Sequence, residues 1–276
     1  MSPATPVICP FCYLGLRKLQ KALSTSPHIS PSPSSSSSSP SPTAFFQPPS
    51  IRFLPYELDP TLPSDHAVPK RERYIAKFGG DAARTSAMES MMKANGEREG
   101  IKFDYGGNIR NTLLSHRLME RAFAGPKGHN DSEGAGWETQ LALLDKLFPH
   151  FFEHRGDPGD PAALARIAVE ASVFPSEDEA LKFLTESDEY GPEVQEGIQD
   201  ARRKGITGVP HFEIFAGGSK EGKETVVKAE IPGAQDADTF VAVFRQLAEA
   251  YQRANGGSKG DEVEKVAPGT SAGAKC

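Results

Sequence analysis

Apolar side chains recur at helical spacing through most of the chain. Near the start, Leu16, Leu19 and Leu23 fall on neighbouring turns, which predicts a helix from about Phe11 to Ser24. The same periodicity predicts a long run of helices in the middle of the chain and one near its end. These helices are expected at 69–78, 81–99, 112–124, 137–154, 161–172, 177–186, 190–204 and 236–254.

Strand signals are confined to the two ends of this helical run. Short apolar or β-branched segments predict strands at 6–8, 51–56, 211–215 and 224–229. The last two strands flank Gly217-Gly218-Ser219, which predicts a hairpin turn. The element order is strand, helix, strand, many helices, strand, strand, helix. It predicts an α/β fold with a helical domain inserted into it.

Two segments lack the apolar side chains that a core needs and are expected to be disordered. One is rich in serine and proline, and the other is a Gly-, Lys- and Glu-rich tail. Removing both leaves roughly 225 residues, enough for a sizeable core. The predicted divisions are a sheet domain at 1–23, 51–63 and 205–254, a disordered insertion at 24–50, a helical domain at 64–204 and a disordered tail at 255–276.

Charge and composition exclude several classes of function. The net charge of −6 and the lack of a basic stripe argue against a nucleic-acid partner. No segment reaches the roughly 18 apolar residues of a membrane span, so no membrane partner is expected. The first residues lack a basic and apolar secretory signal, which predicts a cytoplasmic protein. In such a reducing compartment, a close cysteine pair is more often redox-active or metal-binding than structural.

Cys9 and Cys12 stand where the first strand is expected to give way to the first helix. A helix N-terminus supplies partial positive charge and free N–H groups, which stabilise a thiolate. The spacing of the pair places both sulfurs on the first turn, close enough to bridge. We therefore expect Cys9 to be the exposed attacking thiol with the lower pKa, and Cys12 to be the buried resolving thiol. Pro10 would fix the backbone of the first turn.

A CxxC pair alone leaves other interpretations open. Zinc sites use the same spacing but need two further ligands, such as a second CxxC or a pair of histidines. The third cysteine of the chain, Cys276, is its last residue. We favour a redox pair over a metal site or an inert pair, and expect no metal.

Pro210 lies directly before an expected strand. Proline cannot be a central ladder residue, so this position predicts a special turn, of which a cis Val209–Pro210 bond is one form. With the CxxC at a strand–helix junction, the element order is the plan of a thioredoxin-like α/β fold with an inserted all-helical domain.

Five motifs resemble the DsbA-like thioredoxin family, in particular its FrnE-like branch. The branch pattern CPWCYxGxxxLxxAL corresponds here to CPFCYLGLRKLQKAL, with Phe11 in place of tryptophan. The other four motifs, in chain order, are FLPYELDP, NTLLSHRLMERAF, GITGVPHFEIF and IPGAQDADTFVAVF. They follow the family's order and cover nearly the whole chain outside 24–50 and the tail.

The resemblance implies thiol–disulfide oxidoreductase activity on a protein or small-molecule disulfide or dithiol. Cys9 would form a mixed disulfide that Cys12 resolves. Pro210 would be a cis-proline facing the pair, and the Val209 backbone would bind substrate by strand-like hydrogen bonds. Pro10 and Phe11 would complete the substrate-binding residues. No cofactor is implied, with glutathione as an alternative co-substrate.

Two other functions stay open. The same superfamily includes 2-hydroxychromene-2-carboxylate isomerases and kappa-class glutathione transferases, which hold glutathione in the cleft. These relatives tend to lack the second cysteine, so the Cys9/Cys12 pair favours the oxidoreductase. The third option is a catalytically decayed binding module, because the family's first strand usually runs longer than the eight residues before Cys9.

Three further features have structural interpretations. His116, in the NTLLSHRLMERAF motif, either lines a substrate cleft between domains or packs and hydrogen-bonds, and we favour packing. His150 and His154 share a helix face but lack a third ligand, which favours a surface or helix-end role. Residues 217–224 mimic a phosphate-binding loop but end in glutamate and lead into a strand, which favours a hairpin turn.

Overall fold

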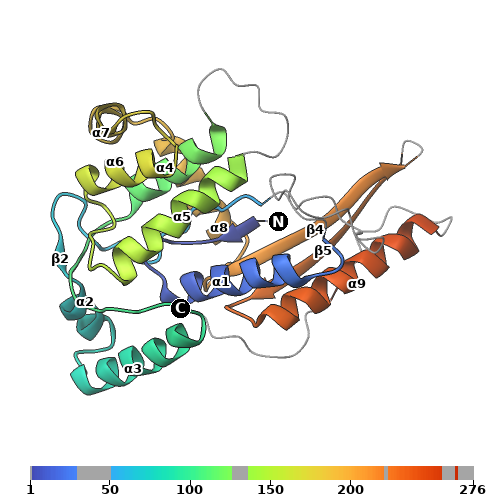
Figure 1. The fold of residues 1–276 in the computed structure, drawn as a ribbon, viewed down its shortest axis with the longest axis horizontal. Coiled ribbons are helices and arrows are strands. Elements are labelled where there is room, and N and C mark those ends of the chain that lie inside the picture. Colours follow the sequence, from blue (N-terminus) through green and yellow to red (C-terminus); the bar gives the residue numbers. More distant parts are fainter. Residues whose placement is uncertain (1, 30–50, 126–135, 221–222, 257–264, 267–276) are drawn as a thin grey trace.

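A mixed sheet with two long helices forms one part of the molecule, and a group of mostly shorter helices forms the other (Figure 1). The computed structural model describes residues 2–29, 51–125, 136–220, 223–256 and 265–266. Within these residues, no helix combines the length and apolar character needed to cross a bilayer.

The larger sheet has the strand order β1-β4-β5-β6. Its centre is the antiparallel hairpin of β4 (His211–Lys220) and β5 (Lys223–Pro232). β1 (Ser2–Ala4) runs antiparallel to the start of β4, and β6 (Lys265–Val266) runs parallel to β5.

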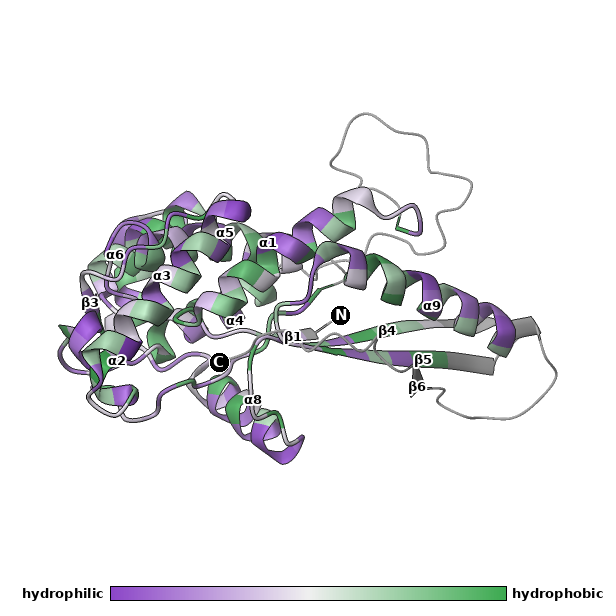
Figure 2. Cartoon of the chain, turned by 90° about the horizontal axis from the view of Figure 1, so that it is seen from below, coloured by the Kyte–Doolittle hydropathy of each residue, from purple (hydrophilic) through white to green (hydrophobic). Residues whose placement is uncertain are grey.

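One face of this hairpin is covered by α9 (Ala237–Gly256), which lies beside α1 (Pro10–Thr25) (Figure 2). Phe212, Ile214 and Ala216 of β4 are buried on this face, since alternate residues of a strand point to the same side of the sheet. Phe212 of β4 meets Phe240 of α9 edge to face, with ring centroids 5.0 Å apart. These apolar contacts fix the sheet against α9, which in turn packs beside α1, the helix that carries Cys12.

The helical part lies between α1 and β4 in the sequence. It also contains a two-stranded ladder of β2 (Val68–Pro69) and β3 (Asn108–Ile109), so the prediction that it is all-helical is wrong at these residues. Its helices are α2 (Lys70–Lys77), α3 (Ala82–Arg98), α4 (Leu113–Ala124), α5 (Gly136–Phe152), α6 (Pro161–Glu170), α7 (Glu177–Glu186) and α8 (Gly191–Arg203). Each of them confirms a helix expected from periodicity.

The two predicted N-terminal strands differ from the observed structure. The first strand is expected at 6–8, but the observed strand is β1, at Ser2–Ala4. Residues 6–9 instead turn toward α1, with the Cys9 N–H donating to the Pro6 carbonyl. The segment 51–56 forms only a bridge, in which Leu54 pairs in parallel with Ala4. Pro55 follows directly and has no N–H with which to continue a ladder.

The predicted turn at Gly217-Gly218-Ser219 is wrong, because β4 continues through it to Lys220. Residues 221–222, between the two strands, lie outside the described residues. Some residues of the two segments predicted to be disordered belong to regular elements. Thr25 still belongs to α1, α9 reaches Gly256, and Lys265–Val266 form β6. Residues 30–50, 257–264 and 267–276 lie outside the described residues.

Candidate functional site

The CxxC segment forms the first turn of α1. Cys9 is the N-cap residue with an extended backbone (φ −96°, ψ 117°), and Pro10 follows as the first helical residue. The Cys9 carbonyl accepts the N–H of Cys12 at 3.0 Å and that of Tyr13 at 3.3 Å. Proline suits this place because an N–H there would have no acceptor within the helix. The helix therefore begins inside the CxxC segment, as predicted.

The two cysteines are both buried, with 0% of Cys9 and 1% of Cys12 exposed. Cys12 has a free thiol, and burial raises its pKa well above the ordinary value, because the interior disfavours the thiolate. Cys9 is disulfide-bonded in this structure. The expected exposure of Cys9 is wrong in this structure, where its sulfur packs against the loop that carries Val209.

The loop between α8 and β4 brings Val209 and Pro210 to the CxxC segment. The Val209–Pro210 peptide bond is cis, and the Val209 carbonyl oxygen lies 3.8 Å from the sulfur of Cys9. The Pro210 carbonyl accepts the N–H of Gly233 at 2.8 Å, which ties the loop to the end of β5. Both loop residues are buried. Residues 200 positions apart in the sequence thus meet at the start of α1.

Gly15 allows α1 to lie this close to the loop. A β-carbon at this position would lie 2.9 Å from Cγ of Pro210 and 3.3 Å from Cζ of Phe212. The proline ring has little freedom to move away, so any larger residue would push the helix and the loop apart. Gly15 was not among the site residues expected from the sequence, although a glycine inside a helical pattern is a known signal of close packing.

The remaining predicted substrate-binding residues, Pro10 and Phe11, are partly exposed beside Cys9. Phe11 also packs its ring against the hydrophobic core. Cys9, Val209, Pro210 and these two residues therefore lie together, as the sequence motifs implied, but only Pro10 and Phe11 reach the surface.

His116 is buried in α4 and hydrogen-bonded on both ring nitrogens. Nδ1 donates to the Thr112 carbonyl at 2.8 Å, and Nε2 accepts the Tyr56 N–H at 3.5 Å. Burial lowers its pKa to about 4, although the bond to Thr112 acts in the opposite direction. These contacts are those of a packing and hydrogen-bonding residue.

Tyr13 joins α1 to α5, a contact that the sequence analysis did not predict. Its ring stacks on Phe148 with centroids 4.8 Å apart, and its hydroxyl donates to Glu153 at 2.6 Å. Burial and the bond to Glu153 raise the pKa of Tyr13 to about 12. Arg17, one turn further along, pairs with Asp145 of α5 at 3.1 Å. The residue next to Cys12 is thereby fixed to the helical part.

His150 and His154 line a surface pocket of about 340 Å³ beside α5 and α6. His150 Nε2 donates to the Asp157 carbonyl at 3.2 Å, which accounts for one of its nitrogens. Across the ranges that the structure describes, no group of three His, Cys, Asp or Glu side chains is arranged to hold a metal ion.

Comparison with solved structures shows the same fold in two proteins. A probable DsbA oxidoreductase from Streptomyces coelicolor is 22% identical, with a TM-score of 0.63 over 95% of this chain and 92% of its own. A putative protein disulfide isomerase from Nitrosomonas europaea is 13% identical, with a TM-score of 0.54 over 92% of this chain and 97% of its own. The search of curated proteins returned no match.

A family model extends the likeness to the sequence. The model of the DSBA-like thioredoxin domain matches residues 5–245, which include the CxxC segment, the helical part and the loop with Val209 and Pro210. This match confirms the predicted family and the thioredoxin-like fold, while the FrnE-like branch stays a prediction. The chain belongs to the DSBA-like thioredoxin domain family.

Proposed function

We propose that the protein is a dithiol–disulfide oxidoreductase in which Cys9 attacks and Cys12 resolves. The observation that carries this proposal is the position of Cys9. It is the N-cap of a 16-residue helix, with its sulfur 3.8 Å from the Val209 carbonyl of the cis-proline loop. Membership of the DSBA-like family supports the same activity.

The two thiols suit different steps. At the helix N-terminus, the partial positive charge of the helix favours a thiolate on Cys9 once it is reduced. Cys12 lies one turn inside the helix, and its raised pKa keeps it protonated at neutral pH. Cys9 therefore reacts first, and Cys12 reacts only when a bond to Cys9 is available to attack.

Reduction of a substrate disulfide then takes two exchanges. The Cys9 thiolate attacks one substrate sulfur, forms a mixed disulfide and releases the other substrate sulfur as a thiolate. Cys12 loses its proton and attacks the Cys9 sulfur, which releases the second substrate thiolate and leaves a Cys9–Cys12 disulfide. The substrate gains two electrons and the pair loses two. An external dithiol, or two molecules of glutathione, returns the pair to its reduced form.

The substrate class follows from the loop beside Cys9. A peptide that carries the target disulfide would pair with the Val209 backbone as an added strand, while Pro10 and Phe11 contact its side chains. We propose protein or small-molecule disulfides as substrates and a reducing compartment, the cytoplasm, as the site of action.

Single cysteine variants test the proposal. With dithiothreitol as reductant, the reduction of insulin disulfides is measured for the wild type, Cys9→Ser, Cys12→Ser and the control Cys276→Ser. We expect Cys9→Ser to lose nearly all of the catalysed rate, by about 100-fold or more, because no thiolate remains at the helix N-terminus. Cys276→Ser should keep its rate.

The Cys12→Ser variant should accumulate a mixed disulfide between Cys9 and substrate, detected as a mass increase of the intact protein. Equal rates for the wild type and Cys9→Ser would reject the oxidoreductase. Consumption of glutathione with an electrophilic substrate, unaffected by Cys12→Ser, would instead support a transferase or isomerase.

A further inference from the structure

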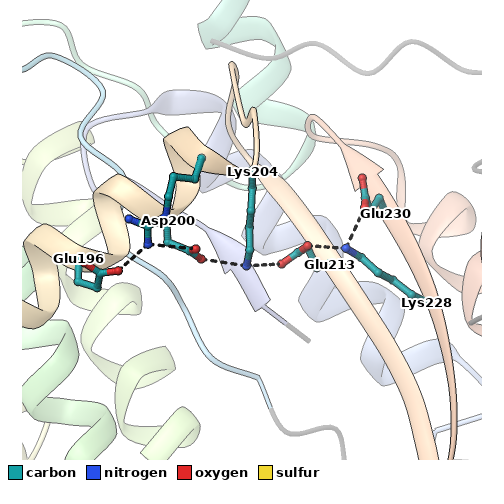
Figure 3. Close-up of polar contacts among 7 residues, drawn as sticks. Glu196, Asp200, Lys204, Glu213, Lys228 and Glu230 are labelled. Carbon is teal, nitrogen blue, oxygen red and sulfur yellow. Dashed lines mark hydrogen bonds and ion pairs between the residues drawn. The ribbon is translucent and has the colours of Figure 1, made fainter.

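A chain of charged side chains crosses from α8 to the β4–β5 hairpin (Figure 3). Glu213 lies at its centre, with only 9% of its side chain exposed. Its carboxylate accepts from Lys228 at 2.6 Å on one oxygen and from Lys204 at 3.5 Å on the other. Lys204 also pairs with Asp200 of α8 at 3.0 Å, and Lys228 with Glu230 of β5 at 2.9 Å.

The two ends of the cis-proline loop meet in this network. Lys204 is the C-cap residue of α8, and Glu213 is the third residue of β4. The loop itself is residues 205–210, between the end of α8 and the start of β4, and it ends with Val209 and Pro210. The Lys204–Glu213 pair therefore joins the two ends of the loop. The Tyr56 hydroxyl contacts the loop separately, by donating a hydrogen bond to the Ile206 carbonyl at 3.4 Å.

The charge of Glu213 is unusual for its position. Its strand neighbours Phe212 and Ile214 are buried in the core on the side of the sheet covered by α9, and Glu213 points to the other side. Burial by itself raises the pKa of a carboxyl group, but the bonds from Lys228 and Lys204 outweigh it and hold the pKa of Glu213 below its usual value. The carboxylate is therefore ionised at neutral pH, with Lys228 held by a short charge-assisted bond at 2.6 Å and Lys204 by a longer ion pair at 3.5 Å.

We propose that Glu213 is a positioning residue that fixes the cis-proline loop over Cys9 through Lys204 and Lys228. The inference deepens the proposed function, because the loop's Val209 is the backbone that would bind a peptide substrate. A fixed loop presents that backbone in one orientation, so less freedom is lost when a substrate chain binds.

Matched carboxylate-to-amide variants test this role. Glu213→Gln removes the central charge at nearly constant shape. Glu196→Gln makes the same change at the outer end of the network, where the side chain of Glu196 is 67% exposed and, among the described residues, pairs with Arg203 alone. Lys204→Met removes the ion pairs that connect Glu213 to α8 and keeps the Lys228–Glu213 pair. Thermal unfolding of each variant first establishes that it is folded at the assay temperature.

Hydrogen–deuterium exchange of the amides in 205–212 measures the loop without any need for turnover. We expect exchange in Glu213→Gln to be faster by about tenfold, because loss of a buried charge-assisted contact makes local opening easier. Lys204→Met should change in the same direction and Glu196→Gln should match the wild type. An exchange rate of these amides in Glu213→Gln equal to that in the wild type would overturn the inference, whether or not the protein proves to be an oxidoreductase.

Kinetics separate a positioning role from a general loss of structure. For a disulfide-bonded peptide, Glu213→Gln should raise KM by about fivefold with kcat changed less than about twofold, since the loop acts on binding. With dithiobis(nitrobenzoic acid), which is too small to pair along the loop, Glu213→Gln should react at the same rate as the wild type. An equal loss with both substrates would contradict positioning through the loop. Inactivity of the wild type itself would reject the proposed function while the exchange result still stands.

Discussion

At the scale of single residues, burial keeps two ionisable groups of the core neutral. Cys12 and His116 are both almost fully buried. The interior opposes charge on each of them, so the pKa of the thiol rises and that of the imidazole falls. Burial therefore keeps the Cys12 thiol protonated until the second exchange. It also keeps His116 neutral, so that at neutral pH the imidazole acts as a fixed hydrogen-bonding group and not as an acid or base.

His116 should make the fold sensitive to acid. Its pKa is about 4 in the folded protein against about 6.5 in the unfolded chain, so between these values the unfolded chain binds more protons. The stability contribution of the neutral ring is therefore complete above pH 6.5 and is lost as the pH falls toward 4. Between pH 7 and pH 4.5, we expect the wild type to lose about 2 kcal/mol more of its free energy of unfolding than His116→Gln loses.

Urea unfolding at the two pH values measures this difference. His154→Gln, the same substitution at an exposed histidine, is the control. A parallel loss of stability in the wild type and His116→Gln would show that the imidazole is not held neutral by the fold.

At the scale of elements, α1 connects the parts of the site. Tyr13 ties it to α5, Gly15 admits the cis-proline loop, and Lys18 pairs with Asp236 just before α9 at 2.7 Å. The helix therefore positions both cysteines relative to α5, the cis-proline loop and α9.

Gly15→Ala tests the contact between α1 and the loop. Helix propensity alone predicts that alanine stabilises the protein by about 1 kcal/mol. The clash with Pro210 and Phe212 predicts the opposite, a net loss of about 1–3 kcal/mol. Urea unfolding gives the sign, with Lys21→Ala on the exposed side of the same helix as control. A Gly15→Ala protein more stable than the wild type would refute the close contact.

Most helices could be predicted from the sequence because their signals are local. Asp81, Asp160 and Ser176 are N-caps whose side chains accept backbone N–H groups three residues ahead, as their residue types indicated. The strands near the N-terminus were harder, since proline residues break their ladders and pairing depends on distant partners. The contact between Tyr13 and Glu153 could not be predicted, because no local pattern links residues 140 positions apart.

At the scale of the whole molecule, the site is made by chain topology. Cys9 and Val209 meet because the helical part leaves and returns to the sheet between β1 and β4. Periodicity alone could not predict this meeting, and only the ordered motifs around the CxxC segment and Pro210 pointed to it. The boundaries proposed for the two domains stay a prediction, while the fold and family are confirmed by the match over residues 5–245.

The most direct test of the account is the pH dependence of the alkylation of Cys9 in the reduced Cys12→Ser/Cys276→Ser protein. The proposed role requires the helix N-terminus to favour the thiolate of Cys9. We therefore expect the rate of reaction with iodoacetamide to reach half of its maximum at least about one pH unit below the ordinary thiol value of about 8.5. A midpoint at or above that value would contradict the claim that the fold activates Cys9.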